Sequence, residues 1–285
     1  MSKPKTELVA KSNRLIEASY RLGLVEQQIV LYAICRAREE QKGLGQDQVG
    51  LFQNLPLTIR AADFAAQFST GSGTVYDQLK DALSALYSRS VTIHDTHPET
   101  GKARVTETRW ISDKSYVDGA GIIEFTFAPL VIPYITRLGE DGEFTSYRLE
   151  KIGKFSSGYA VRLYEMLVQH LSLGKREVEV AWLRTALCLD GEYLRIVDFK
   201  KWVVDVAVAQ INEHSDIEVS YTQRKTGRSV THLDFKIKRK AEDKPKAKKK
   251  PVADRPYVEK HARPGESYDQ AYRRLAEDAG QQRLV

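Results

Sequence analysis

One stretch of this chain, residues 195–214, limits the possible folds more than any other, because its apolar residues recur with the period of an α-helix. One face of that helix is apolar, with spacings of three and four: Ile196, Phe199, Val203, Val206, Ala207 and Ile211. The opposite face is polar: Asp198, Lys201, Asp205 and Asn212. This division predicts an amphipathic helix with one side packed on a core.

Two alternating runs come after this helix. Their apolar positions are Ile217, Val219 and Tyr221, then Leu233, Phe235 and Ile237. Alternation predicts two strands, each with one buried face. The expected turn between them carries the cations Arg224, Lys225 and Arg228. A helix followed by a hairpin with a basic tip is typical of a winged helix; the alternative is an amphipathic helix and a solvated hairpin in another kind of α+β domain.

The start of the expected helix carries the side chains best placed to touch DNA. Arg195 lies at its beginning, Lys200 on the border between the two faces, and Lys201 on the polar face with Asp198. Cations on the outer face near a helix N-terminus suit a helix that enters a major groove end-first. We therefore predict that these four residues, with the three cations of the turn, form the main DNA-binding surface.

The first half of the chain predicts a related order of elements. Residues 24–40 predict a strong helix, and residues 57–68 a second helix capped by Thr58 or a neighbour. A third helix has a core face of Val75, Leu79, Leu83 and Leu86. Helix, glycine-containing turn, helix is the helix-turn-helix pattern.

The turn of this helix-turn-helix offers further candidate contacts. Ser72 and Thr74 lie in or next to the turn, and Lys80 lies on the helix after it. Backbone amides and small hydroxyls at a helix N-terminus bind phosphate oxygens. The other interpretation is a plain turn between two helices. We include these three residues among the candidate DNA contacts.

A hairpin is expected next, with strands at 91–94 and 105–111 on either side of the turn at 97–101. A third strand, 122–127, is expected to complete a wing-like sheet. The order helix, helix-turn-helix, hairpin thus occurs twice, without obvious sequence identity between the halves. The predicted architecture is α+β: two tandem winged-helix domains followed by a basic C-terminal tail.

The expected domain boundaries are 1–144, 145–240 and 241–285. In the tail, Ala241–Lys250 is Lys-rich with few apolar residues, which predicts a disordered linker. Ser267 and Gln270 fit a capping box, which predicts either a short helix that docks on a partner or a transiently helical tail.

Charge is distributed unevenly among these three segments. Residues 1–144 hold 16 Lys and Arg against 18 Asp and Glu, residues 145–240 hold 17 against 12, and residues 241–285 hold 11 against 8. The net charge of +6 is therefore the sum of −2 in the first segment, +5 in the segment with the expected DNA-reading helix and +3 in the tail. A basic surplus on one domain is the electrostatic footprint of phosphate binding, although basic patches also serve solubility.

The rest of the composition indicates a globular protein of the cytoplasm. No apolar run approaches the ~18 residues of a membrane span, and the first residues show no signal-peptide pattern. Cys35 and Cys188 lie in apolar helical patterns, which predicts buried free thiols rather than a disulfide.

With both halves considered, the chain resembles the iteron-binding replication initiators of theta-replicating bacterial plasmids, the RepE and π type. The resemblance covers residues 11 to about 240 and excludes the tail. Three groups of segments carry it: Lys11–Ala18 with Leu24–Gln28; Tyr159–Glu165; and Asp198–Lys201 with Ile211–Glu213, Gly227–Arg228 and Thr231–His232.

This resemblance implies a function. Such proteins bind direct repeats at a plasmid origin as monomers, help to melt an adjacent AT-rich region, and recruit host replication initiator, helicase and chaperones. As dimers, many repress their own gene. By resemblance, Arg195 and Lys201 match positions that contact bases or phosphates, and the three cations of the turn match the basic wing. Trp202 departs from the pattern, since some relatives carry a further arginine there.

Enzymatic alternatives find little support in the residues. A rolling-circle nicking enzyme needs two histidines flanking one bulky apolar residue, but His94 and His97 are separated by two polar residues. An ATPase needs a phosphate loop ending in Gly-Lys-Ser/Thr, and Gly71–Thr74 lacks the lysine. No Cys/His cluster has zinc spacing. We therefore expect no catalytic residues, no metal and no cofactor.

Two further points concern function and assembly. A winged-helix transcription repressor or a partition protein would share the fold, and fold alone does not fix function. The apolar residues of the first strong helix, Ile29 and Tyr32 among them, exceed what one buried face needs. We therefore expect a homodimer in equilibrium with monomers, with its contact within residues 1–144.

Overall fold

The computed structural model describes residues 8–41, 56–68, 75–97, 99–136 and 143–241, together with residues 270, 271 and 274. By their contacts, Met1–Lys240 form one compact unit and Ala241–Val285 a second. The expected glycine-containing turn with Ser72 and Thr74 lies outside the described residues. So do the expected linker after Ala241 and the capping residue Ser267.

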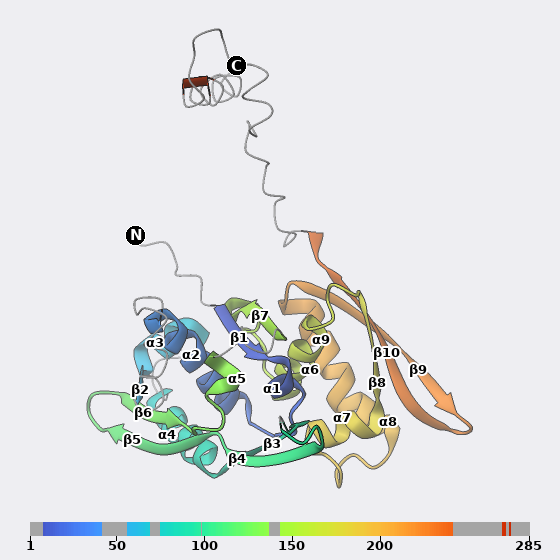
Figure 1. Cartoon of the computed structure of the whole chain (residues 1–285), viewed down its shortest axis with the longest axis horizontal. Coiled ribbons are helices and arrows are strands. Elements are labelled where there is room, and N and C mark those ends of the chain that lie inside the picture. The colour runs from blue at the N-terminus through green and yellow to red at the C-terminus, as the bar shows by residue number, and fades with distance from the viewer. Residues whose placement is uncertain are drawn as a thin grey trace. The chain divides into compact units, whose positions relative to one another are not determined.

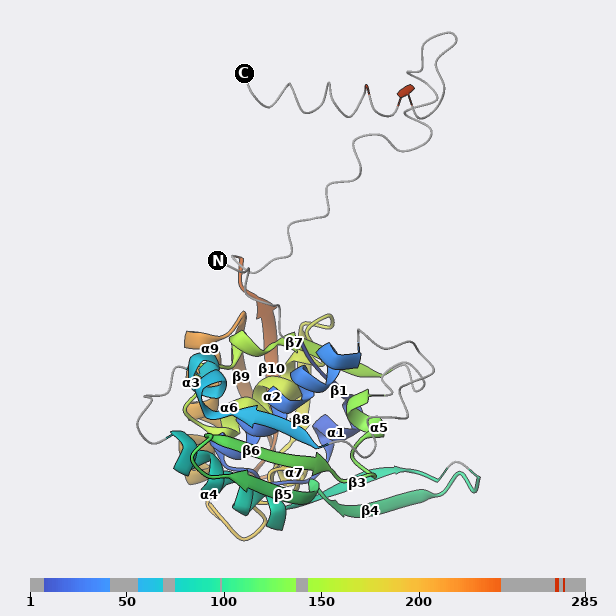
Figure 2. The same ribbon diagram turned by 90° about the vertical axis from the view of Figure 1, so that its left-hand side faces the viewer.

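The first part of the larger unit mixes short strands with helices, as Figures 1 and 2 show. Its elements are β1 (Leu8–Ser12), α1 (Asn13–Glu17), α2 (Leu24–Gln41), β2 (Leu57–Arg60), α3 (Ala61–Phe68), α4 (Val75–Ser88), β3 (Ser90–Thr96), β4 (Ala103–Arg109), β5 (Ile111–Val117), β6 (Ile122–Phe127), α5 (Pro133–Thr136) and β7 (Phe144–Arg148).

The second part begins with a 3-10 turn, Leu149–Lys151. It continues with α6 (Gly158–Val168), β8 (Lys175–Glu179), α7 (Val180–Ala186), α8 (Ile196–Phe199), a π-helical segment (Lys200–Val204), α9 (Asp205–His214), β9 (Ile217–Thr226) and β10 (Ser229–Arg239). The start of the chain joins the end of the first part, because β1 pairs with β7 in antiparallel register.

The strands form four small antiparallel sheets in the described residues, with the orders β1-β7, β8-β10-β9, β2-β6-β5 and β3-β4. The expected helix pair 24–40 and 75–86 is confirmed as α2 and α4, and α4 buries Val75, Leu79, Leu83 and Leu86 as predicted. The hairpin expected after residue 90 is confirmed as β3–β4, which projects as an arm in Figure 2.

Two sequence predictions for this part are wrong. Residues 57–60 are strand β2 rather than the first turn of a helix, because Leu57 and Ile59 alternate with exposed neighbours and pair with β6. The strand at 122–127 does not extend the β3–β4 hairpin; it lies between β2 and β5 in a separate sheet. The chain turns at the fully buried Trp110, which follows β4, so that β5 joins the β2-β6-β5 sheet instead.

The helix α2 is buried on every side, from Glu26 to Cys35. Ile29 is 0% exposed and Tyr32 2% exposed, and both belong to the common core. The apolar surplus that suggested a dimer contact is therefore used within the monomer, and these two residues are not available to a second copy.

A second central helix, α6, carries charged side chains into the core. All its residues from Ala160 to Leu167 are buried. Glu165 accepts hydrogen bonds from Lys11 Nζ at 2.8 and 3.0 Å and from the Tyr147 hydroxyl at 2.5 Å. Burial alone would lower the pKa of Lys11, but the charge of Glu165, its hydrogen bond to Lys11 and the nearby Tyr20 together outweigh burial, so this pKa lies above its usual value. Burial and the same carboxylate raise the pKa of Tyr147 well above its usual value.

One turn earlier, Arg162 is also buried and satisfies backbone carbonyl groups. Its guanidinium donates to Ile16 O at 2.9 Å, to Ala18 O at 2.8 Å and to Ala186 O at 3.3 Å. It also lies 3.6 Å from the centroid of the Tyr20 ring. The helix α6 thereby joins the start of the chain to β7 and to the end of α7.

The two cysteines differ in burial. Cys35 is buried as predicted, whereas Cys188 is exposed, which corrects that expectation. Cys188 lies where α7 has ended, and its φ of 52° turns the chain out of the helical pattern on which the prediction was based. Among the described helices, none is both long and apolar enough to cross a lipid bilayer.

The ion pair of Lys11 and Glu165 makes a stability prediction. Lys11→Met should lower the free energy of unfolding by about 3–5 kcal/mol, because it leaves the buried carboxylate without its cation. The double variant Lys11→Met/Glu165→Gln should recover at least half of that loss, since the new amide is uncharged and its oxygen still accepts from Tyr147. Urea denaturation followed by circular dichroism measures both.

Lys175→Met on the exposed start of β8 is the matched control and should change stability by less than about 0.5 kcal/mol. A single variant at Lys11 as stable as this control would contradict the assignment.

Candidate nucleic-acid interface

The expected DNA-reading helix is confirmed as a continuous helical segment from Ile196 to His214, with a π-helical turn in its middle. Its core side holds Phe199, Val203, Ala207 and Ile211, all buried as the spacing predicts. Val204 is also buried and Val206 only partly so, because the π turn adds one residue and shifts the helical phase of the residues after it.

The hairpin after this helix is also confirmed, as β9 and β10. Ile217, Val219, Leu233, Phe235 and Ile237 are buried as the alternation predicts. Thr226 pairs with Ser229, so the tip is a two-residue turn of Gly227 and Arg228. The expected longer turn is wrong, because Arg224 and Lys225 belong to strand β9 and pair with β10. Gly227 has a φ of +62°, which a glycine adopts without strain. This turn presents Arg228 at the end of the wing.

Three contacts fix the wing against the helix. The Tyr221 hydroxyl donates to Asp205 at 2.5 Å, and burial with this hydrogen bond raises the Tyr221 pKa well above its usual value. Lys200 Nζ donates to Gln223 Oε1 at 2.9 Å. The Asn212 side chain donates to Val219 O at 2.8 Å and accepts from Val219 N at 2.7 Å. Helix and wing therefore form one framework.

The candidate cations divide into two groups on this framework. Lys201, Lys225 and Arg228 are exposed, and none of them is ion-paired with a carboxylate of the described chain. Arg224 is paired instead with Glu177 of β8 and, at 3.9 Å, with Asp234 of β10. Lys200 is held between helix and wing, and its Nζ lies 5.7 Å from the centre of the Tyr221 ring. Lys201, Lys225 and Arg228 therefore have more freedom than Arg224 and Lys200 to meet a phosphate or a base.

Arg195 and Asp198 lie together at the helix start. Arg195 is the N-cap residue, its side chain is 78% exposed, and its Nε lies 3.6 Å from Asp198 Oδ2. Lys201 Nζ lies 4.6 Å from the centre of the Trp202 ring, so the departure at Trp202 gives Lys201 a cation–π neighbour.

Lys80 belongs to a different part of the molecule. It lies on α4, apart from α8 in Figure 1, and forms an ion pair of 3.0 Å with Asp118 in the turn after β5. The rings of Tyr76 and Tyr116 flank its Nζ at 5.5 and 5.4 Å. The exposed acids Asp77 and Asp81 lie on the same helix. The structure thus does not bring Lys80 together with the cations of the second half.

A residue that the sequence patterns did not single out, Arg184 on α7, positions the loop before the reading helix. Its guanidinium donates to Glu192 O at 2.8 Å and to Tyr193 O at 2.7 Å, and lies 4.3 Å from the centroid of the Phe199 ring. Tyr193 has a φ of 50°, which is uncommon for a residue with a side chain. Arg184 therefore stabilises a turn that costs backbone energy and that sets the start of α8.

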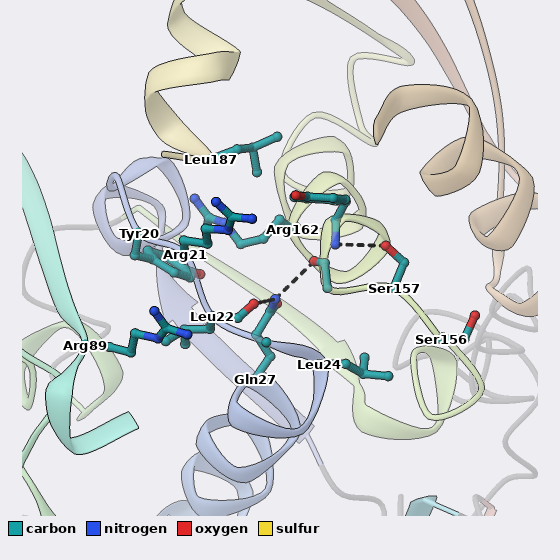
Figure 3. Close-up of a pocket in the computed structure, with 13 residues that line it drawn as sticks. Tyr20, Arg21, Leu22, Leu24, Gln27, Arg89, Ser156, Ser157, Arg162 and Leu187 are labelled. Carbon is teal, nitrogen blue, oxygen red and sulfur yellow. Dashed lines mark hydrogen bonds between the residues drawn. The ribbon is translucent and has the colours of Figure 1, made fainter. Parts of the chain in front are cut away.

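A cavity of ≈ 480 Å³ lies where the start of α2 meets the start of α6, and Figure 3 shows the side chains that line it. Its arginines are engaged by the chain itself: Arg21 is paired with Glu192, Arg89 with Glu26 at 3.2 Å, and Arg162 with backbone carbonyls. The Arg21 pair connects the first half of the chain to the loop that precedes the reading helix.

The same joint leaves little room for a side chain at position 158. Gln27 Nε2 donates to Leu22 O at 2.9 Å and to Gly158 O at 3.1 Å, as Figure 3 shows. A Cβ at position 158 would lie 2.7 Å from that nitrogen, which is too close for any side chain unless the glutamine moves. The close approach of the two helix starts is therefore part of how the two halves fit together.

Fold and site together define a class, the tandem winged-helix proteins. In this chain, the start of the helical segment 196–214 and the basic wing of the second winged helix face solvent. Comparison with known proteins agrees. Residues 8–168 match the family model described as "Initiator Replication protein, WH1", and residues 179–237 match "Initiator Rep protein, WH2". The chain belongs to this family of replication initiator proteins, and its two winged-helix domains are those of the family.

Individual relatives show the range of similarity. A "Replication initiation protein" of Escherichia coli is 25% identical over 120 residues, which span 40% of this chain and about a third, 36%, of that protein. The crystal structure of the Pi initiator protein in complex with iteron DNA has 21% identity and a TM-score of 0.60, covering 82% of this chain and 98% of that one. It shows a common fold.

A third relative is the WH1 domain of MSBI1.176, a replication protein isolated from a multiple sclerosis patient. It is 39% identical, covers 42% of this chain and 84% of that domain, and has a TM-score of 0.33.

The role of Arg184 can be tested without any ligand. Arg184→Ala should increase amide hydrogen exchange over residues 192–199 about tenfold, because two charge-assisted hydrogen bonds to carbonyls are lost. Mass spectrometry of the exchanged protein resolves that segment. Arg109→Ala removes a comparable bond, from Arg109 to Tyr87 O at 2.8 Å, and should leave residues 192–199 unchanged. Equal exchange in both variants would show that Arg184 does not hold the loop.

Proposed function

We propose that this protein is a non-enzymatic initiator of plasmid replication that binds direct repeats in duplex DNA at an origin and promotes local melting. The observation that carries the proposal is the second winged helix, which exposes Arg195 and Lys201 at the start of its reading helix and Lys225 and Arg228 on its wing. Membership of the initiator family supports it. So does the common fold with the Pi initiator, whose structure contains iteron DNA.

The division of labour within the chain is part of this proposal. Residues 145–240 supply the main reading surface, because they hold the cationic surplus and the exposed cations. Residues 1–144 supply auxiliary contacts, with Ser72, Thr74 and Lys80 as the candidates, and the dimer contact. Asp77 and Asp81 on α4 oppose phosphate, so the first part contributes less affinity. The basic tail, 241–285, adds sequence-independent affinity through counterion release.

A homodimer that represses its own gene is also proposed, together with host initiator, helicase and chaperones as partners. Because Ile29 and Tyr32 are buried in the monomer, the dimer contact uses other residues or requires the first part to open. Sedimentation across micromolar concentrations tests this: a concentration-dependent dimer is expected, and monomers throughout would contradict it.

A DNase I footprint of the full chain on plasmid DNA distinguishes the initiator from its nearest alternative. Protection of several tandem direct repeats next to an AT-rich segment is the expected result. A winged-helix repressor or a partition protein would instead protect a lone inverted repeat or a site away from any origin, and that pattern would overturn the proposal.

We expect two cations to have different roles: Lys201 should read a base, and Arg228 should bind a phosphate. Lys201→Ala should weaken binding to the protected repeat and relax the preference at about one base pair by roughly 1–3 kcal/mol, since a lysine there reaches guanine O6 or N7. Arg228→Ala should weaken binding to repeat and random DNA by similar factors and reduce the salt slope by about one unit, since a wing tip meets the backbone.

Competition binding over a salt series measures both variants. Lys236→Ala, on the exposed side of β10 away from the tip, is a control expected to keep the preference. Equal loss on both DNAs for Lys201→Ala would show that Lys201 contacts a phosphate and that the helix is placed wrongly in the groove.

A further inference from the structure

Two apolar side chains lie on the outer side of the reading-helix start, where the fold does not use them. Leu194 is 79% exposed and Val197 is 60% exposed. Leu194 directly precedes the N-cap Arg195, and Val197 and Lys201 are four residues apart within the helical segment. Val197 and Lys201 therefore point away from the buried side of the helix, which carries Phe199 and Val203.

The position of Val197 is unusual for a valine. It lies in the first turn of α8, shortly after the N-cap Arg195, and valine forms helices less readily than alanine. Neither burial nor helix propensity accounts for a branched apolar side chain at this exposed position. Its neighbours are the cations that the proposed function brings to DNA, so the same ligand would cover it.

The edges of base pairs in a major groove are polar with one exception, the C5 methyl group of thymine. The first residues of a recognition helix are the ones that reach those edges. We propose that Val197 is a specificity-determining residue that contacts the methyl group of a thymine in the bound repeat. This inference rests on the proposed function and extends it from cations that read guanine to an apolar contact that reads thymine.

The geometry also places that thymine. Residues 197 and 201 are four apart, about 6 Å along a helix axis. Successive base pairs are separated by about 3.4 Å. The thymine read by Val197 should therefore lie roughly two base pairs from the base pair that Lys201 reads.

Deoxyuridine tests the contact directly, because it lacks only the C5 methyl group of thymine. The probe is a duplex selected from a random-sequence pool by the full-length protein, with each thymine replaced singly by deoxyuridine. Wild-type protein should lose about fourfold in affinity at one or two positions, the factor that corresponds to burial of one methyl group. Val197→Ala should lose affinity for the thymine duplex and show no further loss at one of those positions.

Val105→Ala is the matched control, since Val105 is 64% exposed on β4, a strand of the other hairpin. It should keep the full wild-type pattern of deoxyuridine sensitivity. Val197→Thr, nearly the same shape with one methyl group replaced by a hydroxyl, should lie between wild type and alanine. Circular dichroism establishes that each variant is folded.

The outcomes separate this inference from the function on which it rests. If the selected duplex is bound no better than random DNA, both are overturned. If the duplex is preferred but Val197→Ala keeps every deoxyuridine sensitivity, only the thymine contact is overturned. Unchanged DNA binding by Val197→Ala would also overturn it.

Discussion

The ion pair between Lys11 and Glu165 is the interaction on which the rest of the structure depends. Both side chains are buried, so two charges lose their hydration. This cost is offset only when Lys11 and Tyr147 both lie within hydrogen-bond distance of Glu165. This condition links the first strand, β7 and the central helix α6. Arg162 adds hydrogen bonds to a carbonyl of the first part, Ile16 O, and to one of the second part, Ala186 O, so the two winged helices form one compact unit.

The candidate DNA-binding surface depends on this core through a short series of contacts. Tyr164 of α6 donates to Asp216 at 2.8 Å, and Asp216 pairs with Arg239 at 3.0 Å, which fixes the base of the β9–β10 hairpin. Arg184 and Arg21 hold the loop that leads into α8. The helix and wing that carry the candidate DNA contacts are thus held in place by polar contacts to the rest of the fold. A preorganised binding surface requires such support.

Local periodicity predicted the reading helix and the core face of α4, because each helical pattern runs over ten or more residues, and it predicted the wing, because two alternating runs of five residues lie on either side of a turn. It failed where a pattern is short: Leu57 and Ile59 alternate over only four residues of β2, and their pairing with β6 decides the outcome. The exposure of Lys201 and Arg228 could be predicted, because it follows from the position of each residue within its own helix or hairpin. The ion pair of Arg224 with Glu177 and the hydrogen bonds of Arg184 to the loop before α8 could not, because each joins two separate segments of the chain.

The proposed function requires the start of the reading helix to enter a groove within a specific repeat. A cleavage reagent of iron and EDTA attached at Asp198→Cys, in a Cys188→Ser background that removes the exposed thiol, measures this directly. DNA cleavage should be confined to a few base pairs inside the protected repeat, on both strands around one groove. Cleavage spread evenly along the duplex, or confined to DNA outside the repeat, would contradict this placement of the helix.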